Sequence, residues 1–246
     1  MINRYASLRQ GLVGAWCPSL GASGFRLIDR SGNGNHGTLT NMDPGTDWVP
    51  SGGKLALDFD GVNDGVSVGS FNMNTLNNST NCVSFWINPT NTSAISRPIA
   101  VGEFGSNFAM RYNFENLEFT FGGTAVLSVP MSNANYAGKW THVCGVADSS
   151  GARMFFNGVQ VGTRSDTVGI TKTTGLGIGY RFGANSDYFT GKIDDLRIYS
   201  RALTPSEIRL LYTGGRGVGL APERIKHRRK TSAAATNRRR RILIGA

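Results

Sequence analysis

Short apolar runs separated by glycine, asparagine and serine recur along most of the chain. In the runs at 54–59, 82–88 and 139–147, β-branched and aromatic residues follow one another or alternate with polar ones. Runs a few residues long, spaced by roughly 8–12 residues, are typical of antiparallel strands joined by tight turns. About fourteen such runs lie between residues 11 and 199, which predicts a two-sheet sandwich or a barrel.

One hairpin turn is specified directly by its residues. Asn157-Gly158 separates the apolar runs ARMFF and VQVG. Asparagine and glycine both tolerate the positive φ angles that a two-residue type I′ turn requires. The two runs are therefore predicted to pair as neighbouring strands.

One short helix is predicted near the end of the apolar pattern. Thr204 occupies the N-cap position, Pro205 follows at the first helical position, and Glu207 completes a capping box. Ile208 and Leu211 then fall on one face of the helix, which indicates packing against the sheets.

Charge divides the chain into unequal parts. Residues 216–246 contain ten Lys/Arg and one acidic residue, for a net +9, whereas residues 1–215 contribute only +1 of the total of +10. The pattern predicts three parts: an N-terminal segment at 1–9, a domain at 10–215 and a basic arm at 216–246. Glycine, at 33 of 246 residues, is about twice as frequent as usual and suits a β domain with many turns.

The basic arm has no sustained hydrophobic period and is predicted to be extended. Its charge favours an acidic partner, either a neighbouring protein or a nucleic acid. The residues expected to anchor it are Arg224, Lys226, Arg228, Arg229, Lys230, Arg238, Arg239, Arg240 and Arg241.

Several function classes lack their sequence signatures. No stretch of 18 apolar residues is present, so we expect no membrane span, and the N-terminal sequence shows no secretory signal. An odd number of cysteines (Cys17, Cys82 and Cys144) argues against a disulfide framework. The five glutamates form no E-x-D-x-E strand and G-x-S-x-G is absent, so no catalytic residues are predicted.

A collinear set of motifs resembles the laminin G-like, or concanavalin A-like, jelly-roll family. The set comprises GLVGAW at 11–16, LIDRSGNGNHG at 27–37, LALDFDGVNDGVSV at 55–68 and GKIDDLRIYSRALTPSEIRLLY at 191–212. The resemblance implies an all-β fold, a two-sheet antiparallel jelly-roll sandwich, here with one short C-terminal helix and an extended basic arm. It also implies binding of glycans or proteins rather than catalysis.

Two candidate sites follow. Relatives often hold a structural calcium ion in loops rich in Asp-Gly and Asn-Gly, and Asp29, Asp60, Asp64 and Asp194 are the matching ligands here. The alternative is ordinary capping of turns by aspartate. No other cofactor is expected.

Aromatic residues in polar loops are the second candidate site, because exposed loop aromatics contact glycans or proteins. Trp48 lies in the polar segment 43–53, and Tyr180, Arg181 and Tyr188 flank the Gly/Asn/Ser segment 183–187. The other three tryptophans lie inside strand-like runs and are predicted to pack in the core.

The absence of a signal, the stand-alone domain and the basic arm together suggest a non-catalytic virion structural protein. The hypothesis is a capsid decoration or fibre-associated subunit of a bacteriophage, made in the host cytoplasm. Its arm would anchor it to coat proteins or packaged nucleic acid, as a homo-oligomer or part of a larger assembly, and its jelly roll would contact surface glycans. The alternative is a glycan-binding adhesion module of a bacterial surface or secreted protein, located outside the cell.

Overall fold

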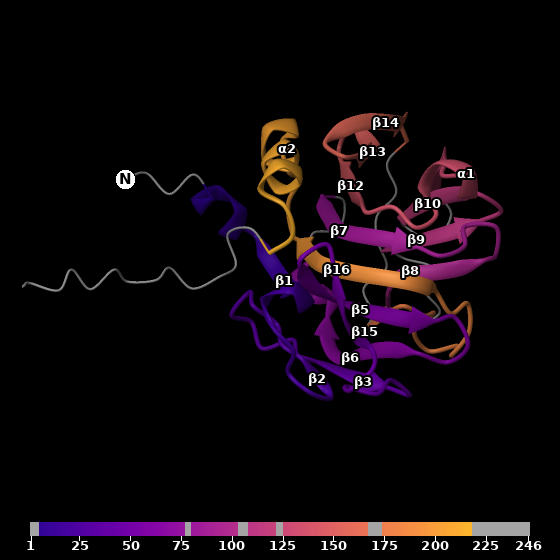
Figure 1. Ribbon diagram of the computed structural model, residues 1–246. Helices are drawn as coiled ribbons and strands as arrows, with labels where there is room; N and C mark the ends of the chain where they lie inside the picture. Colours follow the sequence, from indigo (N-terminus) through magenta and orange to yellow (C-terminus); the bar gives the residue numbers. More distant parts are fainter. Residues whose placement is uncertain (1–4, 77–79, 103–107, 122–124, 167–173, 218–246) are drawn as a thin grey trace, which may run out of the picture.

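Two antiparallel sheets form the structure (Figure 1), a computed structural model that describes residues 5–76, 80–102, 108–121, 125–166 and 174–217. Sheet A runs in the order β14 (Val159–Arg164), β13 (Gly151–Phe156), β12 (Thr141–Asp148), β7 (Asn81–Pro89), β16 (Thr190–Tyr199), β5 (Lys54–Asp60) and β4 (Trp48–Ser51), with β1 (Leu12–Trp16) also paired to β16. Sheet B runs in the order β11 (Ala125–Pro130), β10 (Asn116–Phe121), β9 (Phe108–Asn113), β8 (Ser96–Val101), β15 (Thr174–Ile178), β6 (Gly65–Asn72), β3 (Gly37–Thr40) and β2 (Arg26–Leu27). The helical segments are η1 (Ala6–Arg9), η2 (Pro18–Leu20), η3 (Met73–Thr75), α1 (Asn133–Tyr136) and α2 (Pro205–Gly214).

The predicted two-sheet sandwich is confirmed, and so is the helix at its C-terminal end. The hairpin at Asn157-Gly158 joins β13 to β14, with φ of 51° at Asn157 and 77° at Gly158. The capping box of α2 is formed, because the Thr204 hydroxyl accepts from the Glu207 amide at 3.2 Å and the Glu207 carboxylate accepts from the Thr204 amide at 3.0 Å. Hydrogen bonds from Arg201 lower the pKa of Glu207 to about 2.

Side chains alternate across sheet A and fill two apolar clusters. On β7, Val83 and Phe85 point between the sheets into the main core, whereas Cys82 points outward. The outward cluster is closed by α2 and η1, which contribute Ile208 and Leu8. Each such buried aliphatic side chain contributes about 1.5–3 kcal/mol. The outer face of this sheet is therefore covered where α2 and η1 pack on it.

Two thiols meet within the outward cluster. The Sγ atoms of Cys82 and Cys144, on the adjacent strands β7 and β12, lie 3.3 Å apart, and both side chains are fully buried. Cys17 is buried as well. The three cysteines are free thiols, as the sequence predicts.

One end of sheet B collects the turns that carry the candidate site. We call it the rim: β3, β15 and β9 finish there, and β6, β8 and β10 begin there. The strand register fixes this arrangement, since Thr40 pairs with Gly65, Ile178 with Ile99, and Ser96 with Tyr112. Loops that are distant in sequence are thereby brought side by side.

Candidate functional site

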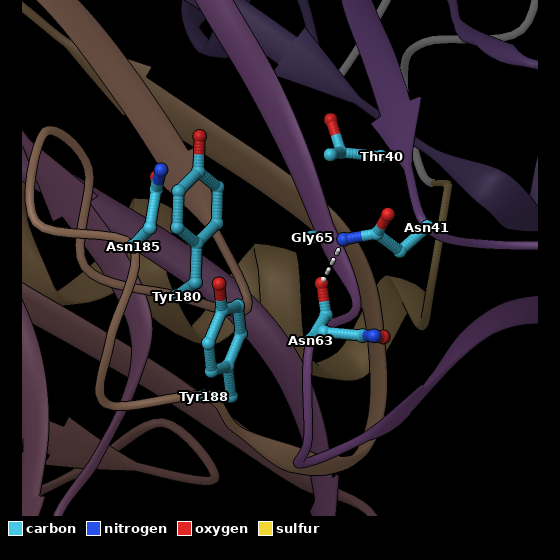
Figure 2. Close-up of a pocket in the computed structure, with 7 residues that line it drawn as sticks. All are labelled: Thr40, Asn41, Asn63, Gly65, Tyr180, Asn185 and Tyr188. Carbon is cyan, nitrogen blue, oxygen red and sulfur yellow. Dashed lines mark hydrogen bonds between the residues drawn. The ribbon is translucent and has the colours of Figure 1, made fainter.

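A pocket of about 90 Å³ opens at the rim, between the ends of β3, β6 and β15 (Figure 2). It is lined by Thr40, Asn41, Asn63, Gly65, Tyr180, Asn185 and Tyr188. Figure 2 shows the two tyrosine rings and Asn185 on one side, with Thr40, Asn41 and Asn63 on the other. The lining thus combines aromatic rings with polar side chains.

The tyrosines form a fixed aromatic wall. The rings of Tyr180 and Tyr188 are stacked, with centroids 6.0 Å apart and planes at 17°. Tyr180 lies directly against the backbone of β6 at Gly65, where a Cβ atom would come within 2.6 Å of the ring. Only glycine permits this approach. Burial raises the pKa of Tyr180, so its hydroxyl stays protonated.

Two of the lining asparagines have the left-handed backbone conformation. Asn41 and Asn185 have φ of 58° and 47°, a region that asparagine enters more readily than most residues. The Asn41 side-chain amide donates to the Asn63 carbonyl at 3.0 Å. In the part of the chain that the structure describes, the side-chain amides of Asn63 and Asn185 make no hydrogen bond, which leaves donors and acceptors for a ligand.

An ion pair ties the loop that carries Asn185 to the neighbouring strand. The Arg97 guanidinium donates to the Asp187 carboxylate at 2.9 Å, and the Arg97 amide donates to the Asp187 carbonyl at 2.8 Å. Arg97 belongs to β8 and is buried. The pocket wall is therefore preorganised by contacts outside the pocket itself.

The lining specifies the chemistry that the pocket can perform. None of its seven lining residues is charged. Hydroxyls and amides can both donate and accept hydrogen bonds, and stacked aromatic rings offer an apolar face. Because ligand sites that enclose a whole molecule measure roughly 300–1,000 Å³, a pocket of this size accepts only part of a ligand.

Two of the four contact residues predicted from the sequence lie in the pocket. Tyr180 and Tyr188 line the pocket, and Arg181 lies beside it, its amide donating to the Ser186 carbonyl at 2.8 Å. The placement of Trp48 in an exposed loop is wrong: it lies in the edge strand β4, is 7 % exposed and packs in the main core. Its indole nitrogen donates to the Gly24 carbonyl at 3.1 Å.

Three of the proposed calcium ligands lie in two separate turns. The two carboxylate oxygens of Asp29 accept hydrogen bonds from Ala15, Ser31 and Asn35 at 2.8–2.9 Å. Asp60 accepts from the Val62 amide at 2.7 Å, and Asp64 accepts from the Asp60 amide at 3.0 Å. These are turn-capping contacts, and within the described ranges no group of three or more His, Cys, Asp or Glu could hold a metal ion. A structural calcium ion stays a prediction.

The fourth, Asp194, belongs to a buried ionic cluster on sheet A, made of Asp194, Asp195, Arg197 and Arg216. Arg197 forms two hydrogen bonds to Asp195, at 2.8 and 2.9 Å. Arg216 lies 3.4 Å from Asp194 and stacks over the Trp140 ring at 4.3 Å. Asp194 is fully buried. Burial, reinforced by the neighbouring Asp195, raises the pKa of Asp194 to about 6.

The arm residues from Arg224 to Arg241 lie outside the described residues, and their anchoring role stays a prediction. Arg216, counted in the arm from the sequence, is part of the ionic cluster, and the Gly217 amide donates to Asp195 at 2.8 Å. At the other end of the chain, Leu8 of the predicted N-terminal segment is buried under the domain.

Five lining residues were missed from the sequence: Thr40, Asn41, Asn63, Gly65 and Asn185. Each lies in or next to a turn, where asparagine is expected for its backbone preferences alone. Only their shared position at the end of one sheet distinguishes them, and that requires the strand register.

A family model described as the concanavalin A-like lectin/glucanases superfamily matches residues 60–209. The chain belongs to the concanavalin A-like lectin/glucanases superfamily. This confirms the resemblance carried by the motifs at 55–68 and 191–212. A search of curated proteins finds no significant match.

Solved structures of this superfamily's fold resemble the chain at low sequence identity. The binding domain of botulinum neurotoxin serotype D matches with a TM-score of 0.64 and 17 % identity over 84 % of this chain and 52 % of that one. Trypanosoma rangeli sialidase with the inhibitor DANA matches at 0.61 and 17 %, over 82 % and 32 %. Domain 4 of the extracellular arabinanase AbnA from Geobacillus stearothermophilus, in complex with arabinotriose, matches at 0.56 and 22 %, over 80 % and 96 %. The chain spans about half the length of the toxin domain.

Proposed function

We propose that this protein is a non-catalytic glycan-binding module whose rim pocket holds a neutral sugar unit. The observation that carries the proposal is the combination of two stacked tyrosines with uncharged amide side chains in one pocket. The apolar face of a sugar ring stacks on aromatic rings, while its hydroxyls need groups that both donate and accept. An uncharged lining favours a neutral sugar over an acidic one.

The neighbours support binding of a carbohydrate. The arabinanase domain, nearly all of which this chain covers, is bound to arabinotriose, and the sialidase is in complex with the inhibitor DANA. Hydrolysis of a glycosidic bond needs two carboxyl groups across the substrate, and none of the lining residues carries one. The proposal is therefore binding without turnover.

The cell surface or the extracellular space is the location where such a module meets its ligand. No described helix has the length and apolar character of a membrane span. The virion hypothesis gains no support from the family or from these neighbours. It stays a prediction that rests on the net +9 charge of residues 216–246.

The test is a panel of immobilised neutral oligosaccharides, including arabinotriose, probed with the full chain and followed by calorimetry on the sugars that bind. Tyr188→Ala removes one aromatic face and should weaken binding at least tenfold without lowering the unfolding temperature by more than a few degrees. Val159→Ala, at an exposed apolar residue of β14 on the other sheet, is the matched control and should change nothing. Absence of binding across the panel, or equal binding by Tyr188→Ala, would refute the proposal.

A further inference from the structure

The turn between β9 and β10 has an unexpected sequence. Phe114 and Glu115 have φ of 46° and 62°, the same left-handed pair of conformations as Asn157 and Gly158 in the β13–β14 turn. Asn-Gly suits that backbone, whereas a bulky aromatic residue at positive φ is a strained outlier. Strain of this kind persists where the surroundings enforce it, and it points to a function.

The surroundings do enforce it. The Glu115 amide donates to the Thr92 carbonyl at 2.9 Å, and the Glu115 carbonyl accepts from the Met131 amide at 2.7 Å. The Asn116 side chain donates to the Phe114 carbonyl at 3.0 Å. The turn is thus held by two other segments of the chain and by the adjacent Asn116, yet Phe114 is 68 % exposed. Its ring is presented to solvent on a rigid support.

Phe114 shares the rim with the pocket. Of the six large apolar side chains exposed among the described residues, four lie in rim loops: Phe25 and Val62 on the β2–β3 side of the pocket, and Ile95 and Phe114 on the β8–β9 side. Between the pocket and Phe114 lie the strands β8 and β9 and the Arg97–Asp187 ion pair. At about 4.8 Å per strand, the turn lies roughly 12 Å from the end of β15.

We propose that Phe114 is a second sugar-stacking contact, so that the rim binds a neutral chain of several sugar rings that extends from the tyrosine pocket to the β9–β10 turn. This rests on the proposed function. The spacing exceeds what a single ring can bridge, which makes the ligand an oligosaccharide. The exposed apolar side chains of the rim lie in turns whose other residues are mostly polar or glycine, which suits a ligand with both hydroxyls and apolar ring faces.

Chain length is the variable that tests this inference. The probes are arabinose, mannose and glucose, each as the monosaccharide and as tri- and hexasaccharides, titrated into the full chain by calorimetry. Phe114→Ala should weaken hexasaccharide binding about tenfold and leave monosaccharide binding unchanged. Val159→Ala should alter neither.

A second variant separates binding from folding. Phe114→Asn places a residue suited to positive φ in the turn, so it should keep or raise the unfolding temperature while losing the same tenfold in hexasaccharide affinity. A fall of several degrees would show that the ring serves the fold, and would overturn the inference.

The remaining outcomes are distinguishable. Unchanged hexasaccharide binding by Phe114→Ala, or an equal loss for monosaccharide and hexasaccharide, overturns the second contact but leaves the pocket standing. If no sugar of any length binds the full chain, both the proposed sugar-binding function of the pocket and the second contact at Phe114 are refuted.

Discussion

The buried ionic cluster on sheet A and the rim pocket on sheet B both contain polar residues at positive φ. They differ in the groups that surround those residues. Each has residues at positive φ: Asp195 at 50° in the cluster, Asn41 and Asn185 at 58° and 47° in the pocket. In the cluster, two carboxylates and two guanidiniums are buried together and pair with one another. In the pocket, amides and tyrosines line an opening.

The comparison shows that charge and strain alone do not identify a binding site. A buried charge that already has its counter-charge belongs to the fold, because any ligand would have to displace that partner. The bulge in β16, where the register shifts between Asp194 and Arg197, turns Asp195 toward Arg197. The pocket offers polar groups for which a ligand does not have to compete.

The largest test of this difference is Arg197→Ala. Removing the guanidinium leaves the Asp195 carboxylate buried without its partner, which should cost about 3–5 kcal/mol of unfolding free energy. Urea denaturation measures it. The control is Lys192→Ala, since both members of the Lys192–Asp58 pair are partly exposed and its loss should cost at most about 1 kcal/mol. Equal losses for the two variants would contradict the structural role of the cluster.

The second test uses pH. Asp194 has a pKa of about 6 in the folded chain, raised by burial, against about 3.9 in an unfolded chain. Between these values the folded state binds more protons, so this group lowers the unfolding free energy as pH rises from about 4 to 6, by up to about 3 kcal/mol. Asp194→Asn should lack that fall.

The measurement is the difference in unfolding free energy between wild type and Asp194→Asn at several pH values. The variant should become more stable relative to wild type as pH rises from about 4 to 6. The penalty for leaving Arg216 unpaired is constant over this range and does not affect the trend. Parallel curves would show that Asp194 titrates normally. Sugar binding should not follow the titration of Asp194 if the two regions are independent.

The smallest expected effect on stability comes from a substitution in the rim pocket. Gly65→Ala places a Cβ atom within 2.6 Å of the Tyr180 ring and should cost about 1–3 kcal/mol while displacing the aromatic wall. Gly69→Ala, in the same strand with open space around it, is the control and should leave sugar binding intact. Binding that survives in Gly65→Ala would separate Tyr180 from the site.

Much of the fold could be predicted because its local signals agree with its global packing. The turn at Asn157-Gly158 and the capping box at Thr204 each specify one conformation by themselves. Strand β4 was missed because Pro50 and Gly52-Gly53 are typical of loops. Proline is tolerated at a sheet edge, where β4 lies, and so Trp48 packs inward from a segment that looks polar.

The site was predictable only where aromatic residues mark it. Tyr180 and Tyr188 stand out because large rings are unusual in polar loops. Asn63 does not, because it lies between Asp60 and Asp64 in a turn that explains all three residues. Asp194 was interpreted as a ligand because its partner Arg216 is 22 residues away, on a segment whose packing no local pattern reveals.

The reactivity of the buried thiols can report local unfolding of the protein. Cys82 and Cys144 lie under α2 and η1, and the chain has no other cysteine except Cys17, which is also buried. A thiol reagent therefore reacts only with molecules that have opened, and the labelling rate of Cys82 and Cys144 measures how often the two helical segments move away from the sheet. Because the native thiols are buried and unreactive in the folded protein, a cysteine introduced at Val62 or Phe114 can be labelled selectively. This places a fluorophore at the rim without removing a native residue elsewhere.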